Sequence, residues 1–397
     1  MNLKDQLEVI KKDTVDFITE EEFLDKLKRK KQLKVKLGVD PSRPDLHLGH
    51  AVVLRKLRQF QRFGHIVYLI IGDFTARIGD PSGRSKTRPL LSEEEVKANS
   101  KTYVEQAFKI LDPNQTVIKF NSEWLSALTF EDIINLTSRY TVARMLERDD
   151  FNKRLAENEP ISISEFLYPI AQAYDSIVIE ADVEMGGTDQ LFNLLVGRKL
   201  QEEFGQEPQI VVTMPLIEGT DGSLKMSKSY NNYIAFNDTP DDIFGKIMSV
   251  PDHLIIKYMT YLTDISRDKI KDFENKMKND EINPRDVKMV LAEEVVKMLY
   301  NEEEAKKAKD NFVAIFQKKD MPDDLPEILV QENETILDIV AKTNVFDSNS
   351  EIKRAISQGA IRINDEKIDD FKFVPNFEDG DVLRVGKKNY FRLKKVK

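Results

Sequence analysis

The sequence VKLGVDPSRPDLHLGH, at residues 35–50, passes from a β-type apolar run into a loop with two prolines, and a helical pattern then continues over residues 51–63. A strand, a short loop and a helix in this order aim the first backbone N–H groups of the helix at whatever binds over the sheet edge. The positive end of the helix dipole points the same way. This stretch therefore predicts a corner that holds an anion.

Three residues of this corner suit a phosphate chain or a ribose. Gly49 has no Cβ to keep such a ligand at a distance, and His47 and His50 can donate hydrogen bonds to its oxygens. A solvent-facing turn with two incidental histidines is the alternative that these residues leave open.

Other apolar runs extend the alternation of strands and helices. They read IVYLII at 66–71, TVIKF at 116–120 and IVVT at 210–213, and helical patterns cover 51–63, 92–111 and 189–204. Strands rich in β-branched residues and separated by helices imply a parallel sheet covered on both faces. We predict an α/β fold with a doubly wound, Rossmann-like parallel sheet, whose ligands bind at the carboxyl ends of the strands.

The chain divides further by pattern and composition. Thr19 and Glu22 form a capping box ahead of an apolar helical repeat, and a stretch rich in prolines and acids lies near residue 325. The predicted segments are an N-terminal helical segment at 1–34, the α/β domain at 35–230, a helical domain at 231–320, a linker at 321–334 and a small α+β domain at 335–397.

The composition excludes several classes of protein. The chain has 397 residues, of which 41% are hydrophobic and 32% charged, so it can bury more than one core. Its 60 Lys and Arg against 69 Asp and Glu leave a net charge of −9, which argues against a surface that binds nucleic acid throughout, and we expect no DNA partner. The last fourteen residues, RVGKKNYFRLKKVK, hold seven basic residues and no acid. Any nucleic-acid site should therefore be local.

The sequence contains no cysteine and only four histidines. Disulfides, thiolate nucleophiles and cysteine-ligated metals are therefore excluded, and we predict no metal site built from protein side chains. No stretch approaches the roughly 18 apolar residues of a membrane span, and the N-terminus has no apolar signal segment. We expect a soluble, cytoplasmic protein with no membrane partner. We also expect His65 and His253 at ordinary loop and cap positions, and Trp124 in the core.

A second chemical motif, KMSKS at residues 225–229, follows the turn GTDG at 219–222. Lys225 and Lys228 on a flexible loop can bring two ammonium groups to a triphosphate, where charge-assisted hydrogen bonds contribute about 1.5–3 kcal/mol each. An exposed polar loop is the alternative for these five residues alone. Their occurrence in an α/β chain that also contains the HxGH corner favours phosphate binding.

Together, HLGH at 47–50 and KMSKS at 225–229 resemble the two signature motifs of class I aminoacyl-tRNA synthetases. GDPSG at 79–83, YPIAQAYD at 168–175 and GGTDQ at 186–190 are similar to segments of the tyrosyl-tRNA synthetases within that class. The resemblance implies a HUP-type catalytic domain that activates L-tyrosine with ATP to tyrosyl-adenylate and pyrophosphate. It further implies transfer of the tyrosyl group to the 3′-terminal adenosine of tRNA(Tyr), and a homodimer.

The resemblance assigns roles to residues by their positions in these motifs. For ATP, the matching residues are Gly38, Asp40, Ser42, His47, Gly49, His50, Asp189, Lys225, Met226, Ser227 and Lys228. In this set Gly38, Asp40 and Asp189 would contact the nucleoside, and the two lysines would form a mobile clamp. Two arginines match basic positions that reach pyrophosphate. The catalytic set implied in this way is His47, His50, Lys225, Lys228, Arg84 and Arg88.

A tyrosine pocket is implied in the same way. Asp175 matches the residue that binds the phenol, and the other matching residues are Asp80, Asn121, Tyr168, Gln172 and Gln190. On a helix, Tyr168, Gln172 and Asp175 share one face. Phenylalanine would leave the buried carboxylate unpaired, a form of selection for which tyrosyl-tRNA synthetases are the standard example. One position departs from the family pattern, because some branches carry a second tyrosine near the phenol where this chain has Lys36.

The C-terminal unit resembles the S4 RNA-binding module, and the helical domain before it would then recognise the anticodon. The matching candidate tRNA contacts, which can pair with phosphates, are Lys353, Arg354, Arg384, Lys387 and Lys388. A solvated basic tail is the alternative. Mg²⁺ is expected to enter with ATP and to be held through water and substrate oxygens.

Three other functions stay open at this point. A tryptophanyl-tRNA synthetase shares the fold and both signature motifs, a nucleotidylyltransferase can use an HxGH corner, and an S4-type RNA-binding protein could carry an inactive enzyme body. The spacing of Tyr168, Gln172 and Asp175, the basic C-terminal unit and the intact motifs favour tyrosine activation over these alternatives.

Overall fold

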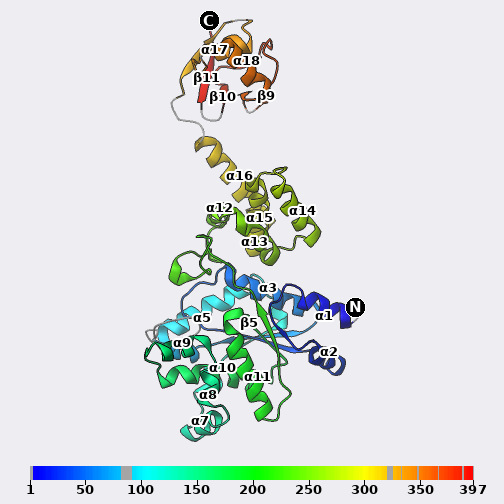
Figure 1. Ribbon diagram of the computed structural model, residues 1–397, viewed down its shortest axis with the longest axis vertical. Coiled ribbons are helices and arrows are strands. Elements are labelled where there is room, and N and C mark those ends of the chain that lie inside the picture. Colours follow the sequence, from blue (N-terminus) through cyan, green and yellow to red (C-terminus); the bar gives the residue numbers. More distant parts are fainter. Residues whose placement is uncertain are drawn as a thin grey trace. The chain divides into compact units, whose positions relative to one another are not determined.

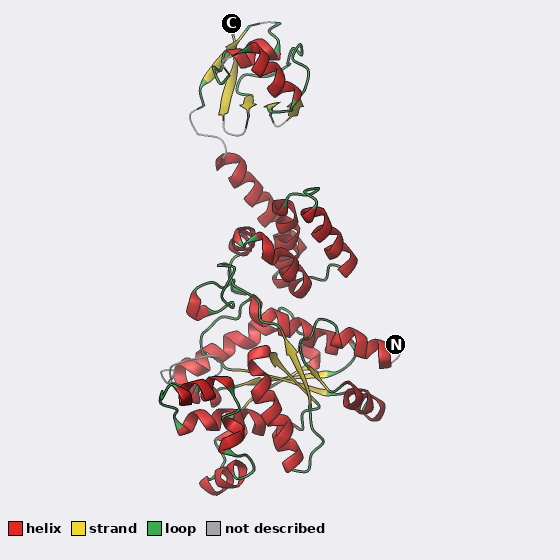
Figure 2. Ribbon diagram, in the orientation of Figure 1, coloured by secondary structure: helices red, strands yellow, loops and turns green. Residues whose placement is uncertain are grey.

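The computed structural model describes residues 3–81, 92–319, 325–331, 333–346, 348–364, 366–386 and 389–396. The chain forms two compact units, Met1–Lys309 and Asp310–Lys397, whose elements are drawn in Figures 1 and 2. In the described parts of the chain, no helix is long and apolar enough to cross a membrane.

A six-stranded sheet forms the centre of the first unit (Figure 2). Its strands are β1 (Phe17–Ile18), β2 (Lys34–Val39), β3 (Ile66–Ile71), β4 (Thr116–Phe120), β5 (Val183–Gly187) and β6 (Ile210–Met214). They lie in the order β1-β6-β5-β2-β3-β4, and all neighbours are parallel except β1, which pairs antiparallel with β6. The chain winds outward from β2 to β4 and then returns to β5 on the other side of β2. This reversal confirms the doubly wound fold and leaves a crevice at the carboxyl ends of the strands.

Four strands lie where the apolar runs predict them, namely β2, β3, β4 and β6. β5 is absent from the prediction because it ends in Gly186 and Gly187, which lower β propensity, although it is buried between β2 and β6. β1 has only two residues, too few for a periodic pattern, and it interrupts the N-terminal segment that the sequence predicts as helical. Both strands owe their structure to pairing with distant segments.

Helices cover both faces of the sheet, with α3 on one side and α10 and α11 on the other (Figure 1). The helices before residue 210 are α1 (Leu3–Lys11), α2 (Glu20–Arg29), α3 (Leu48–Arg62), α4 (Thr75–Ile78), α5 (Glu93–Ala107), α6 (Ser122–Leu125), α7 (Phe130–Thr137), α8 (Val142–Met145), α9 (Asp149–Ala156), α10 (Ile163–Ile179) and α11 (Leu191–Glu203). The hydroxyl of Thr19 caps α2 and that of Ser92 caps α5, as the sequence predicts.

A group of helices follows the sheet in the chain. They are α12 (Pro240–Ser249), α13 (Ile255–Leu262), α14 (Arg267–Lys278), α15 (Pro284–Leu299) and α16 (Glu302–Lys319). α12 packs on α15, whose apolar repeat at Val287, Leu291 and Val295 is fully buried. These helices belong to the first unit as far as Lys309, so the separate helical domain at 231–320 stays a prediction.

The second unit is a small α+β fold. Its elements are β7 (Glu327–Val330), α17 (Ile336–Ala341), α18 (Asn349–Ser357), β8 (Ile361–Ile363), β9 (Glu366–Ile368), β10 (Val382–Val385) and β11 (Asn389–Lys395), and the sheet order is β7-β11-β10-β8-β9. The prolines and acids of residues 321–334 predict a linker, but β7 lies within this range and pairs parallel with β11. Ile328 and Val330 enter the core of the unit, and a pairing with residues so distant in sequence leaves no local signal.

Candidate active site

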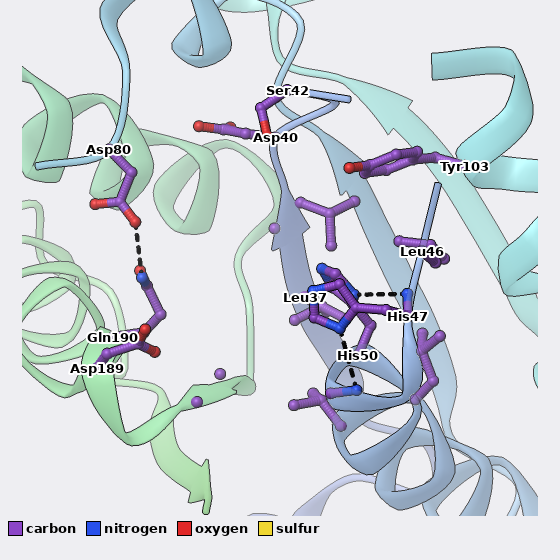
Figure 3. A pocket seen from close by; sticks show the side chains of 18 of the residues that line it. Leu37, Asp40, Ser42, Leu46, His47, His50, Asp80, Tyr103, Asp189 and Gln190 are labelled. Carbon is purple, nitrogen blue, oxygen red and sulfur yellow. Dashed lines mark hydrogen bonds between the residues drawn. The ribbon is translucent and has the colours of Figure 1, made fainter. Parts of the chain in front are cut away.

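A cavity of about 760 Å³ lies at the crevice of the first sheet. Its lining includes every described residue predicted for ATP or tyrosine: Gly38, Asp40, Ser42, His47, Gly49, His50, Asp80, Asn121, Tyr168, Gln172, Asp175, Asp189, Gln190, Lys225, Met226, Ser227 and Lys228. Figure 3 shows Asp80, Asp189 and Gln190 on one side of this space and His47 and His50 on the other. The fold therefore brings the two distant motifs to one site. Arg84 and Arg88 lie outside the described residues.

The HLGH corner is held in shape by its own histidines. His47 is the N-cap of α3, and its Nδ1 accepts the N–H of Gly49 at 3.2 Å, while Nδ1 of His50 accepts the N–H of His47 at 3.1 Å (Figure 3). A Cβ at position 49 would lie 2.9 Å from the His47 ring. Gly49 is thus needed to form this cap. The sequence suggests a different reason for a glycine here, namely room for a ligand.

Both histidines are neutral hydrogen-bond donors. Burial lowers the pKa of His50 to about 3 and, together with the nearby charge, holds the pKa of His47 well below its ordinary value. Because each Nδ1 accepts a backbone N–H, the ring proton is assigned to Nε2. The corner therefore presents two N–H donors that carry no charge at neutral pH.

The two lysines of the KMSKS motif reach across to other elements. Lys225 Nζ donates to Asp189 Oδ2 at 3.0 Å, and Lys228 Nζ donates to the Tyr103 hydroxyl at 2.9 Å and to the Arg43 carbonyl oxygen at 3.2 Å. Burial raises the pKa of Tyr103, which keeps its hydroxyl neutral. The sequence gives no sign of Tyr103, because its partner is far away in the chain.

One wall of the cavity is a network of polar side chains. The Tyr168 hydroxyl donates to Asp40 Oδ2 at 2.9 Å, and Gln190 Nε2 donates to Asp80 Oδ2 at 2.8 Å. Thr75 Oγ1 also donates to Asp40, at 2.8 Å. Asp40 and Asp80 thus each accept a hydrogen bond from a neutral side chain.

Asp175, on α10, is the most deeply buried carboxylate of the lining, at 3% exposure. Trp124 Nε1 donates to its Oδ1 at 2.8 Å and Asn121 Nδ2 to its Oδ2 at 3.4 Å. Burial raises the pKa of Asp175 to about 6, and the charge of Lys36 and the two hydrogen bonds oppose that rise. The two hydrogen bonds orient the carboxylate, whose oxygens keep lone pairs that can accept a hydrogen bond from a ligand.

Trp124 has a second role beyond the core position that the sequence suggests. Its ring packs against the core residues Ile70, Ile179 and Ala181, as expected, but its indole N–H orients Asp175. One feature of the sequence could have indicated this second role: Trp124 lies just after the carboxyl end of β4, where ligand-binding residues of such sheets gather.

The two remaining histidines differ from each other. His65 lies in the turn between α3 and β3, as the sequence predicts, but its side chain is buried: it accepts the N–H of Leu33 at 3.1 Å and lies 2.6 Å from the Gln6 amide nitrogen. His253 is exposed and its Nε2 lies 3.0 Å from the carbonyl oxygen of Gly222, in the turn before KMSKS. Neither lines the cavity.

Over the described part of the chain, no group of three or more His, Cys, Asp or Glu side chains is placed to hold a metal ion. In the second unit, Lys353 and Arg354 are exposed on α18, and Arg384 is half-buried on β10 with its Nε bonded to the Gly386 carbonyl oxygen. Lys387 and Lys388 lie outside the described residues.

A doubly wound sheet with HLGH and KMSKS on one cavity defines a class I aminoacyl-tRNA synthetase. The family model for class I tRNA synthetases (W and Y) matches residues 28–317, and the model for the tyrosine–tRNA ligase SYY-like C-terminal domain matches residues 317–393. The chain is 62% identical to the tyrosine–tRNA ligase of Thermotoga maritima, over 99% of this chain and 98% of that protein. It belongs to the tyrosine–tRNA ligase family.

Other relatives agree with this assignment. The tyrosine–tRNA ligase of Carboxydothermus hydrogenoformans is 52% identical over 98% of both chains. Among solved structures, the tyrosyl-tRNA synthetase of Archaeoglobus fulgidus complexed with L-tyrosine superposes with a TM-score of 0.64 at 22% identity, over 78% of this chain and all of that one. At that identity the superposition establishes the fold. None of these relatives supports the three alternative functions.

Proposed function

We propose that the chain activates L-tyrosine with ATP and transfers the tyrosyl group to tRNA(Tyr). The observation that carries this proposal is the single cavity lined by HLGH, by KMSKS and by the buried Asp175. The two motifs can hold a triphosphate, and the carboxylate can accept a phenolic O–H. One cavity therefore offers sites for both reactants of adenylate formation.

Adenylate formation needs no nucleophile from the protein. A carboxylate oxygen of tyrosine attacks the α-phosphorus of ATP, the bond from that phosphorus to the oxygen bridging the β-phosphate breaks, and pyrophosphate leaves with the electron pair. The enzyme acts by placing the reactants and by stabilising charge on the departing oxygens.

The histidines and lysines act on the phosphates in complementary ways. His47 and His50 donate neutral N–H groups whose orientation is set before ATP binds, which avoids reorganisation during the reaction. Lys225 and Lys228 bring positive charge once they exchange Asp189 and Tyr103 for phosphate oxygens. Arg84 and Arg88 would add charge at the pyrophosphate. Gly38, Asp40 and Asp189 would contact the nucleoside.

Tyrosine is selected at the other end of the cavity. Asp175, held by Trp124 and Asn121, accepts the phenolic O–H. Phenylalanine would leave that acceptor without its partner in a buried site, which is costly. Asp80, Tyr168, Gln172 and Gln190 would surround the rest of the amino acid.

Mg²⁺ enters with ATP in this proposal. It prefers octahedral oxygen coordination and keeps several waters, so phosphate and water oxygens can hold it without a cage of protein side chains. The enzyme would act in the cytoplasm as a homodimer.

The second unit would bind tRNA through its basic residues. Deleting residues 321–397 should spare tyrosine-dependent pyrophosphate exchange and abolish or badly weaken tRNA charging, because the cavity lies wholly in the first unit. The cut precedes β7, because a later cut would leave that strand without β11. Equal losses in both assays would show that the unit is structural.

The first test of the activity is ATP–pyrophosphate exchange with tyrosine, with tryptophan and with no amino acid. We expect exchange with tyrosine alone. Exchange with tryptophan would indicate the related synthetase, exchange without any amino acid would indicate a nucleotidylyltransferase, and no exchange at all would leave an RNA-binding protein.

A further inference from the structure

We propose that Lys36 is a positioning residue for tyrosine: it holds, from behind the cavity wall, the turn of α10 that carries Gln172 and Asp175. Recognition of the phenol would then depend on a charge that the substrate does not touch. The inference rests on the proposed tyrosine-activating function and extends it to a residue for which the sequence suggests no role.

Lys36 lies on β2 with 0% of its side chain exposed. Its neighbours in the strand, Leu37 and Gly38, line the cavity, but Lys36 does not. A lysine is almost never fully buried unless it is paired. Its complete burial next to a binding cavity therefore calls for a reason.

The ammonium group of Lys36 makes three short contacts. It donates to the backbone carbonyl oxygen of Gln172 and to the Ser176 hydroxyl, each at 2.8 Å, and it lies 2.8 Å from Glu184 Oε1. Two of these partners belong to the turn of α10 that contains Asp175. All three donors of the ammonium are therefore used, and two of them tie β2 to the tyrosine side of the cavity.

Glu184, on β5, completes the tie from the other side. Its Oε1 accepts Gln172 Nε2 at 3.2 Å, and its Oε2 accepts the Ser176 hydroxyl at 3.1 Å and a hydrogen bond from Gln209. The same carboxylate thus orients a side chain of the cavity and neutralises Lys36. Its side chain is 1% exposed, so neither charge can be satisfied by bulk water if the other is removed.

The packing around this network leaves little freedom for it to shift. A Cβ at Gly197 of α11 would lie 2.7 Å from Gln209 Nε2 and 3.1 Å from Glu184 Oε2. The network is therefore enclosed by α10, α11 and the strands. If Lys36 is replaced, the turn of α10 that it contacts therefore has to shift.

The charge of Lys36 also acts on Asp175. Burial raises the pKa of Asp175, and the positive charge of Lys36 counters that rise, whereas Glu184 adds to it. Lys36 therefore favours the ionised carboxylate, which is the stronger acceptor for a phenolic O–H. The hydrogen bonds from Lys36 to the α10 turn and the charge of Lys36 thus both favour acceptance of a phenolic O–H by Asp175.

The test uses the full chain with Lys36→Met, Glu184→Gln and the double variant. Tyrosine and phenylalanine are compared as substrates in ATP–pyrophosphate exchange, and folding is followed by thermal denaturation. We expect Lys36→Met to raise the KM for tyrosine and to lower the ratio of kcat/KM for tyrosine over phenylalanine, each by about tenfold, the effect of losing one charge-assisted contact. The KM for ATP should stay unchanged.

The double variant separates positioning from simple stability. Glu184→Gln removes the unpaired buried charge, so Lys36→Met/Glu184→Gln should regain thermal stability, but its ratio for the two substrates should stay low because the contact with the α10 turn is still missing. A double variant that regains thermal stability and also has the wild-type ratio of kcat/KM for tyrosine over phenylalanine would overturn the proposal. So would a Lys36→Met variant with an unchanged KM for tyrosine.

Lys26→Met is the matched control. Lys26 is another buried lysine, 1% exposed, that pairs with Glu207 and Asp182 and does not line the cavity. Both carboxylates keep another cation, Arg29 for Glu207 and Lys30 for Asp182, and Lys26→Met should keep the wild-type ratio of kcat/KM for tyrosine over phenylalanine. A similar fall in that ratio would show that any buried lysine has this effect and would overturn the proposal. A wild-type chain with no tyrosine-dependent exchange would instead refute the proposed function, a result distinct from active variants with unchanged selectivity.

Discussion

Two lysine–carboxylate pairs of nearly equal length lie near the ends of one cavity. Lys225 and Asp189 are 3.0 Å apart with side chains 39% and 28% exposed, whereas Lys36 and Glu184 are 2.8 Å apart with side chains 0% and 1% exposed. An exposed pair contributes little, because water can replace either partner. A buried pair cannot lose one partner without leaving an uncompensated charge.

This difference separates two ways of using charge in one site. The exposed lysine can leave its carboxylate for a phosphate oxygen at small cost, as a mobile clamp requires. The buried lysine cannot leave, so it can only set the position of its surroundings. Under the proposed function, the side of the cavity that takes the nucleotide is therefore suited to exchange of partners, and the side that takes tyrosine to a constant geometry.

The largest expected effect is on stability. Lys36→Met should lower the free energy of unfolding by about 3–5 kcal/mol, because Glu184 is left buried and unpaired, whereas Lys225→Met should change it by less than about 1 kcal/mol. Urea denaturation of the two variants measures the difference. Equal losses of unfolding free energy in the two variants would show that the buried pair and the exposed pair contribute alike to stability.

The next largest effect is on the rate of adenylate formation. His50→Ala or Lys225→Met should slow it by about 10²–10³-fold, as loss of one preorganised donor does elsewhere, and the affinity for tyrosine should not change. Trp124, the only tryptophan in the chain, donates to Asp175, so its fluorescence can follow tyrosine binding in the same stopped-flow experiment. An unchanged rate in both variants would contradict the clamp.

Asp175→Asn should have a smaller effect, confined to the tyrosine side. We expect the preference for tyrosine over phenylalanine to fall by about 10–100-fold, because the amide is a weaker acceptor than the carboxylate, with no change in the KM for ATP. Asp189→Asn is the matched control and should affect ATP alone. A preference unchanged in Asp175→Asn would place phenol recognition elsewhere.

The smallest effect is a dependence on pH. Burial raises the pKa of Asp175 from 3.8 to about 6, with Lys36 opposing and Glu184 supporting the rise. The ionised group therefore costs folding stability above about pH 6, and that cost disappears as the pH falls towards 4. Tyrosine affinity should show the opposite trend and weaken as the pH falls through 6, because protonation removes the charged acceptor.

Titration of Trp124 fluorescence with tyrosine between pH 5 and 8 measures this dependence. In Lys36→Met the midpoint should move to higher pH, since the charge that opposes protonation is gone. Phenylalanine binding should not weaken as the pH falls, because it has no O–H to donate to the ionised carboxylate, and a parallel weakening would assign the titration to another group. His50 does not interfere, because burial lowers its pKa to about 3, and burial likewise holds the pKa of His47 well below its ordinary value.

Much of the fold follows from local sequence pattern. β2, β3, β4 and β6 are rich in β-branched residues and bounded by clear breaks, and capping side chains set the starts of α2 and α5, so local preference and tertiary structure agree there. β1, β5 and β7 escape such a pattern, since they are too short, too rich in glycine or too close to prolines. They become strands because a distant partner supplies their hydrogen bonds.

The candidate site divides in the same way. Residues inside the HLGH, KMSKS and α10 motifs could be named from the resemblance of those motifs to the family's, since each motif is local in the chain. Tyr103 and the Lys36–Glu184 pair could not, because each acts through a partner that only the tertiary structure brings near. For Trp124 the one signal was its place just after the carboxyl end of β4, and its partner Asp175 is likewise distant in the chain. From the sequence, Lys36 is only a departure from the family pattern. The buried partners that explain it are found only in the tertiary structure.

The amino-acid sequence on its own determines which chemical groups are available and the local elements that carry them: paired imidazoles at the start of a helix, paired ammonium groups on a loop, and a carboxylate one helical turn from a glutamine. Tertiary structure alone decides which of these groups face the cavity and which lie behind its wall. Burial and long-range pairing set that outcome, because the free energy of a charge depends on what surrounds it rather than on its neighbours in the chain.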